Sequence, residues 1–105
     1  MATKLIIEYD AENGDAIPDG KAMETVLNAY KLSLRFNTPS FLKTSSENVV
    51  LAARVAIKEG KFSHEKVEFR YKQESWYMDK DGRNEFWPVG FCDTCSRFLE
   101  RLLLI

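Results

Sequence analysis

Residues 40–60 read SFLKTSSENVVLAARVAIKEG and contain the clearest strand-to-helix signal in the chain. The segment Ser40 to Thr44 predicts a short strand. The residues Thr44-Ser45-Ser46-Glu47 then match a capping box, in which Thr44 caps the helix and Glu47 reaches back to a backbone N–H. A helix is expected over residues 46–59, because Gly60 is a typical C-terminal signal. Its apolar stripe consists of Val49, Val50, Ala53 and Ile57.

The sequence before this segment predicts another strand and another helix. Lys4 to Tyr9 is a short apolar run and is interpreted as a strand. Asp10 to Gly20 holds two glycines, a proline and four acidic residues, which predicts a loop. Asp19 is a candidate N-cap for a helix that should end before Asn37-Thr38-Pro39, since the residue before proline disfavours the helical conformation. The apolar positions with helical spacing are Met23, Val26, Leu27 and Tyr30.

The C-terminal half is richer in strands. Residues 67–72 alternate between apolar and charged side chains, the pattern of a half-buried strand. Ser75 to Met78 and Arg83 to Trp87 are expected to pair through a turn at Asp79-Lys80-Asp81-Gly82. A last helix would bury Phe98, Leu99, Leu102 and Leu103. The predicted order is β-α-β-α-β-β-β-α, an α/β (α+β) fold with a single mixed sheet, about three helices and one domain over residues 1–105.

The composition is that of an ordinary globular protein. Charged residues make up 30% of the 105 residues and hydrophobic ones 45%, with a net charge of −1. This balance provides no overall attraction to nucleic acid or to an anionic membrane. No segment approaches the ~20 apolar residues that span a bilayer. Two cysteines are too few for a disulfide scaffold, so we expect a cytoplasmic protein with no membrane partner.

Motifs for catalysis are incomplete. The stretch Gly14 to Ala22 has five residues between its glycines where a phosphate loop has four, and Ala22 stands where Mg²⁺ needs a hydroxyl. His64 is the only histidine, and the acidic residues Asp10, Glu12 and Asp15 are interpreted as a solvated loop. We therefore expect no enzymatic activity and no cofactor.

Cys92 and Cys95 are the weak candidates for a metal site. They form a lone Cys-x-x-Cys pair, whereas zinc prefers four nitrogen or sulfur ligands. Ordinary reduced thiols are the favoured interpretation. Redox chemistry and a zinc ion shared across a dimer stay open as alternatives.

Aromatic side chains are concentrated in the C-terminal third, and most must fill the core. Alternation should leave a ring outside at one or two positions, for which Trp76 and Tyr77 are the candidates. Exposed tryptophan and tyrosine side chains are typical of interaction surfaces.

Two stretches resemble a known family. Thr44 to Arg54, with Glu59-Gly60-Lys61 and Glu65 to Glu68, is similar to the last part of predicted AAA/ABC-type ATPases related to the OLD nucleases. Asp79 to Arg83 and Trp87 to Asp93 resemble the "Asp-Gly-Arg … Trp-Pro-x-Gly-Phe-Phe-Asp" ending of that family. The likeness covers roughly residues 40–103, but the family's histidine that senses the γ-phosphate falls at Ser45 and both Walker motifs are absent from the sequence.

The resemblance implies the structural edge of an ATPase without its nucleotide site. Small free-standing proteins of this kind look like bacteriophage products, which would act in the host cytoplasm. The favoured hypothesis is a non-catalytic protein-interaction or regulatory protein that engages a host ATPase or defence complex, with Trp76, Tyr77, Ser45 and Ser46 as interaction residues. The alternatives are a nucleic-acid-binding protein that uses the strand from Lys66 to Lys72, or an accessory subunit that completes an ATPase site in trans. A homo-oligomer stays open.

Overall fold

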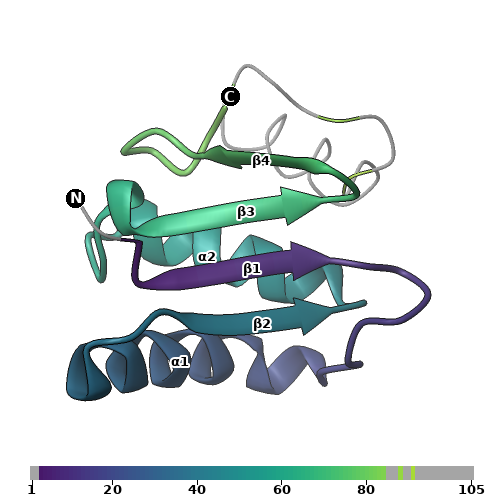
Figure 1. The fold of residues 1–105 in the computed structure, drawn as a ribbon, viewed down its shortest axis with the longest axis horizontal. Coiled ribbons are helices and arrows are strands. Elements are labelled where there is room, and N and C mark those ends of the chain that lie inside the picture. The colour runs from purple at the N-terminus through teal and green to yellow at the C-terminus, as the bar shows by residue number, and fades with distance from the viewer. Residues whose placement is uncertain (1–2, 85–87, 89–90, 92–105) are drawn as a thin grey trace.

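The computed structural model describes residues 3–84 together with Pro88 and Phe91 (Figure 1). Within this part the chain forms one mixed four-stranded sheet with two α-helices and two 3₁₀ turns. The elements in chain order are β1 (Leu5–Tyr9), η1 (Asp19–Lys21), α1 (Ala22–Phe36), β2 (Ser40–Thr44), α2 (Glu47–Lys58), η2 (His64–Lys66), β3 (Val67–Tyr71) and β4 (Glu74–Tyr77). The predicted α+β class with a single mixed sheet is confirmed.

The predicted element order differs from the observed one at the C-terminal side. Arg83 and Asn84, at the start of the expected returning strand, do not belong to a strand. The rest of that strand, residues 85–87, lies outside the described residues. So does the predicted last helix with Phe98, Leu99, Leu102 and Leu103.

The strand order in the sheet is β2-β1-β3-β4 (Figure 1). β1 lies in the interior and pairs in parallel with both β2 and β3, so that Leu5 is opposite Ser40 on one side and Val67 on the other. β4 runs antiparallel to β3 and places Trp76 opposite Phe69.

Within the described residues, the two helices cover one face of the sheet. Successive side chains of a strand point to opposite faces, and Leu5, Ile7, Val67 and Phe69 are all fully buried on the same face. From α2 this face receives Val49, Val50, Ala53 and Ile57, the stripe that the sequence predicts. Each large aliphatic side chain buried in this way stabilises the fold by about 1.5–3 kcal/mol.

Both helices pack on this covered face and against each other. β2 and β3 nevertheless lie on opposite sides of β1. The β1-α1-β2 and β2-α2-β3 connections therefore cross the sheet in opposite directions over the same face, so they have opposite hands. One of them is of the left-handed kind that is rare between parallel strands.

The helix ends agree only partly with the predicted signals. α1 ends at Phe36, and Asn37 adopts a left-handed conformation whose N–H donates to the Ser33 carbonyl, as the approaching proline predicts. The predicted N-cap of α1 was placed too early, because Asp19 begins the 3₁₀ turn and Lys21 occupies the capping position. Proline at position 18 fixes the chain direction before this turn.

The loop after β1 is clamped against the end of β2. The N–H of Asp15 donates to the Lys43 carbonyl at 2.9 Å, and the Asp15 carbonyl accepts from the Ser45 N–H at 3.0 Å. This approach requires glycine at position 14, since a Cβ atom there would lie 2.2 Å from the carbonyl carbon of Thr44. The loop cannot move away without breaking the two backbone hydrogen bonds.

We predict that Gly14→Ala destabilises the fold by about 1–3 kcal/mol, the usual range for overpacking against atoms that cannot move aside. Gly20→Ala is the matched control, because a Cβ at Gly20 meets nothing within 4 Å, and it should change stability by less than about 1 kcal/mol. Urea unfolding of both variants measures the difference. Equal midpoints would show that the loop is not clamped.

Candidate interaction surface

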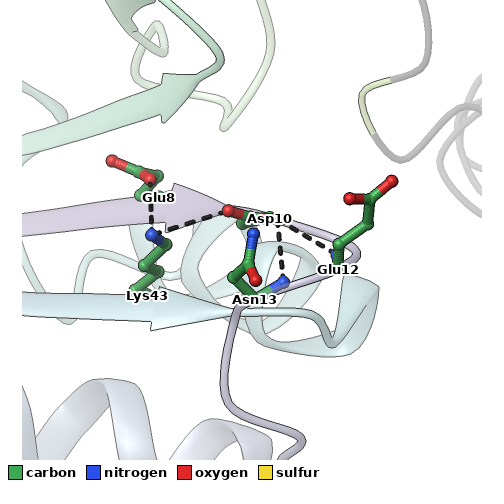
Figure 2. A network of polar contacts seen from close by, with 5 residues as sticks. All are labelled: Glu8, Asp10, Glu12, Asn13 and Lys43. Atoms are coloured by element: carbon green, nitrogen blue, oxygen red, sulfur yellow. Dashed lines mark hydrogen bonds and ion pairs between the residues drawn. The ribbon is translucent and has the colours of Figure 1, made fainter.

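A polar network lies where β1 and β2 end (Figure 2). The Lys43 ammonium group on β2 lies 3.7 Å from the Glu8 carboxylate and 3.5 Å from the Asp10 carboxylate. Lys43 and Glu8 are opposite each other in the parallel register, which brings the first pair together. Because both pairs are partly exposed, solvent screens them and each contributes little to stability.

Asp10 is held more firmly by backbone groups than by Lys43. Its Oδ1 atom accepts hydrogen bonds of 3.0 Å from the N–H groups of Glu12 and Asn13 (Figure 2). These two amides, with a smaller contribution from Lys43, lower the pKa of the Asp10 carboxyl from its ordinary value of 3.8. The Asp10 carboxylate therefore stabilises the turn that begins the loop.

We predict that the Asp10 carboxyl titrates below 3.8 in the folded protein. Its contribution to stability is fully present above that pH and is lost as the pH falls through the lower folded pKa. An NMR titration of the Asp10 side-chain carbon measures the midpoint. Lys43→Met should leave most of the shift in place, because the backbone amides are its main cause; a midpoint that returns to 3.8 in this variant would contradict the assignment.

Thr44 connects the loop, β2 and α2. Its side chain is fully buried, and its hydroxyl donates to the Asp15 carbonyl at 2.8 Å and accepts from the Ser46 N–H at 2.9 Å. The predicted capping box is therefore wrong in its details. Ser46 is the N-cap of α2 and makes no side-chain capping hydrogen bond, while Thr44 lies two residues before the cap.

Removal of the Thr44 hydroxyl should cost about 1 kcal/mol, because Thr44→Val removes the acceptor of the Ser46 N–H and one of the two donors to the Asp15 carbonyl, which keeps its bond from the Ser45 N–H. Ser45→Ala is the control. The Ser45 side chain makes no hydrogen bond within the described residues, so its loss should change stability by less than about 0.5 kcal/mol. Thermal or urea unfolding distinguishes them, and equal stability of the two variants would refute the role of the hydroxyl.

The structure separates the four residues predicted for interaction. Ser45 and Ser46 lie at the end of β2 and are both half-buried. Trp76 is on the covered face, buried, with its ring edge-on to Phe91 at 4.8 Å. Tyr77 is the ring that alternation leaves outside, and its hydroxyl hydrogen-bonds Thr3 and, at 3.5 Å, Glu68. Trp76 is therefore part of the hydrophobic core, whereas the Tyr77 side chain is accessible to solvent.

The open face of the sheet has balanced charges. Arg70 pairs with Glu68 on the same strand, and the guanidinium carbon of Arg70 lies 6.0 Å from the ring centre of Phe41. The Lys43–Glu8 pair lies beside them on the neighbouring strands. Basic groups that are neutralised by carboxylates offer little to a phosphate backbone. This pairing neutralises Arg70, one of the three basic residues on which the nucleic-acid alternative based on residues 66–72 depends.

An exposed apolar surface lies near β2, the edge strand at the opposite side of the sheet from β4. Large hydrophobic side chains are exposed there by 49% at Leu32, 66% at Phe36 and 51% at Phe41. Leu32 and Phe36 are four residues apart and share one side of α1. Tyr30, on the other side of α1, stacks on Phe62 just after α2 at 4.7 Å. Leu32 and Phe36 therefore face away from α2. α1 itself packs against β2, which is an edge strand of the sheet (Figure 1).

We call Leu32, Phe36 and Phe41 the β2-edge patch. Sequence reasoning missed it, because it followed a single apolar stripe along this helix that ends at Tyr30 and did not separate the two faces of β2. The register shows what could have found it: Leu42 is opposite the buried Ile7, so alternation turns Phe41 to the open face. Leu34 is also exposed, by 53%, but lies on the side of α1 that carries Tyr30.

His64 lines two shallow hollows of about 470 and 410 Å³. Its Nδ1 atom lies 2.9 Å from the Met78 carbonyl, so this nitrogen carries the proton and Nε2 is the acceptor in the neutral ring. Lys58 and Lys80 line the smaller hollow above an apolar floor. The arrangement suits a small anion with an apolar part, but both lysines are exposed and nothing fixes their positions.

The described part of the chain has neither a metal-binding cluster nor a membrane-spanning helix. No group of three or more candidate ligand residues gathers there to hold a metal ion. The weak candidates Cys92 and Cys95 lie outside it. No helix among the described residues is both long and apolar enough to cross a bilayer.

Comparison of the chain with protein-family models, curated proteins and solved structures gave no match. The resemblance to OLD-related ATPases therefore stays a hypothesis from the sequence, and the class of this protein is argued from its own surfaces.

Proposed function

We propose that this chain is a non-catalytic protein-interaction domain that binds its partner through the β2-edge patch. The observation that carries the proposal is the clustering of exposed apolar side chains. Three of the five exposed large hydrophobic side chains in the described residues form the β2-edge patch, and the other two, Leu34 and Tyr77, lie outside it. Contiguous apolar surface of this kind is typical of interaction sites, whereas single exposed hydrophobic residues are ordinary.

The geometry supports a defined docking site. The patch spans the C-terminal half of α1 and the beginning of β2, two elements that pack against each other. It is therefore presented by regular secondary structure rather than by loops, which favours a preformed interface. The turn after α1 is tied to β1 by the hydrogen bond of 3.1 Å that the Lys4 ammonium donates to the Asn37 side chain.

The resemblance of residues 40–103 to a part of OLD-related ATPases indicates where to look for the partner. A fragment that lacks the nucleotide site but keeps the structural edge would be suited to bind an ATPase assembly. In this proposal the chain regulates such an assembly, as a phage-encoded factor would regulate a host ATPase or defence complex. Nucleic acid is the less favoured partner because Arg70 is neutralised by Glu68.

We predict that the double variant Leu32→Ser/Phe36→Ser keeps its fold and loses its partner. Both side chains are largely exposed, so little buried area is lost. Affinity purification from the native host, followed by mass spectrometry, compares the variant with wild type. Leu34→Ser is the matched control, since it removes a similarly exposed leucine from the other side of the same helix.

The expected result is one set of partners captured by wild type and Leu34→Ser and lost from the double variant. Circular dichroism and unfolding must show that the variants remain folded. Partners retained by the folded double variant but lost on Tyr77→Ser would place the interface on the open face instead.

A further inference from the structure

We infer that the partner segment is extended and acidic and that it binds by adding a strand to the outer edge of β2. This inference rests on the proposed function, because it uses the β2-edge patch and specifies what binds there. It adds two properties that the proposal leaves open: the backbone conformation of the partner segment and the sign of its charge.

The outer edge of β2 has room for another strand. Toward β1, the Ser40 N–H donates to the Lys4 carbonyl at 2.9 Å and the Thr44 carbonyl accepts from the Asp10 N–H at 2.8 Å. On the outer side, the backbone partner among residues 3–84 is Asp15, which bonds the Lys43 carbonyl and the Ser45 N–H. Since alternate residues of a strand direct their peptide groups to opposite sides, the N–H and C=O of Phe41 and the N–H of Lys43 point outward.

Apolar side chains lie on both sides of this edge. Leu32 and Phe36 flank it on the face that the helices cover, and Phe41 flanks it on the open face. An added strand directs its side chains alternately to the two faces. Such a strand would therefore place one set of side chains near Leu32 and Phe36 and the other near Phe41, whereas a helix docked on either face would meet only part of the patch.

The charge around the edge selects an acidic partner. Residues 25–46 contain Lys31, Arg35 and Lys43 and no acidic residue. Asp15 is acidic and lies on the same edge, but it pairs with the C-terminal end of β2 at Thr44, whereas Lys31 and Arg35 belong to the part of α1 that carries Leu32 and Phe36. Lys43 is paired with Glu8 and Asp10, but Lys31 and Arg35 are exposed on the part of α1 that borders Leu32 and Phe36. A second copy docked patch to patch would bring these like charges together. A segment with carboxylates beside apolar side chains matches the edge in both charge and polarity.

The experiment is an unbiased selection of 12-residue peptides displayed on phage or mRNA against the immobilised full chain. Recovered peptides are synthesised and their Kd values measured by fluorescence anisotropy for wild type, Leu32→Ser/Phe36→Ser, Lys31→Glu/Arg35→Glu and Leu34→Ser. We expect acidic, apolar peptides. Their affinity should fall at least about tenfold for each double variant and less than about twofold for Leu34→Ser.

Backbone methylation of one selected peptide tests strand addition directly. In an added strand every second N–H faces β2, so N-methylation at alternate positions should abolish binding while methylation at the positions between should be tolerated. Binding that is insensitive to this alternation would overturn strand addition.

The failures of the two proposals are distinguishable. Peptides that depend on Leu32 and Phe36 but are neutral or basic would overturn the acidic partner and leave the interaction surface in place. Peptides whose binding does not depend on the patch would overturn the proposed docking site itself. If no peptide is recovered while wild type binds phosphatidylserine-containing vesicles through Lys31 and Arg35, the occupant would be an anionic lipid surface, and both proposals would fail.

Discussion

The buried hydroxyl of Thr44 joins three parts of the molecule that are distant in sequence. It bonds the loop after β1 through Asp15 and the start of α2 through Ser46, while the backbone of Thr44 pairs with the end of β1. Gly14 packs directly on this residue, and no larger side chain fits there. The place where the chain leaves β1 for α1 and the place where α2 begins are both set by this junction. The Asp10–Lys43 network forms beside it because the loop returns to β2 at this point.

The one-sided covering of the sheet determines what can act as an interface. Because α1 and α2 share one face, the other face keeps its polar side chains in contact with solvent, and these are largely paired with one another. The outer edge of β2 differs, since apolar side chains from both faces meet there without a neighbouring strand among the described residues. Proteins usually shield such edges with charges or prolines. Here Pro39 precedes β2 and Lys43 lies within it, which limits pairing to a short segment.

The sequence predicts most of the described elements, because their signals are local. The alternation in residues 67–71 and the stripe of Val49, Val50, Ala53 and Ile57 report burial on one face, and both appear in the structure. The caps were less predictable. Thr44 has the residue type of an N-cap, but its hydroxyl is taken by the Asp15 carbonyl, 29 positions away along the chain. The β2-edge patch depends on which strand becomes the sheet edge, and no local pattern around Phe41 contains that information.

The position of β1 has a consequence for biosynthesis. β1 lies between β2 and β3 in the sheet yet precedes both in the chain. As the chain emerges from a ribosome, β1 with Leu5 and Ile7 is synthesised first and both of its backbone edges are unpaired. One edge can pair only after α1 and β2 have been made, and the other only after α2 and β3. Contacts so distant in sequence form slowly, because each requires closure of a long loop. The nascent chain therefore passes through a stage in which β1, an interior strand of the finished sheet, has no strand to pair with on either side.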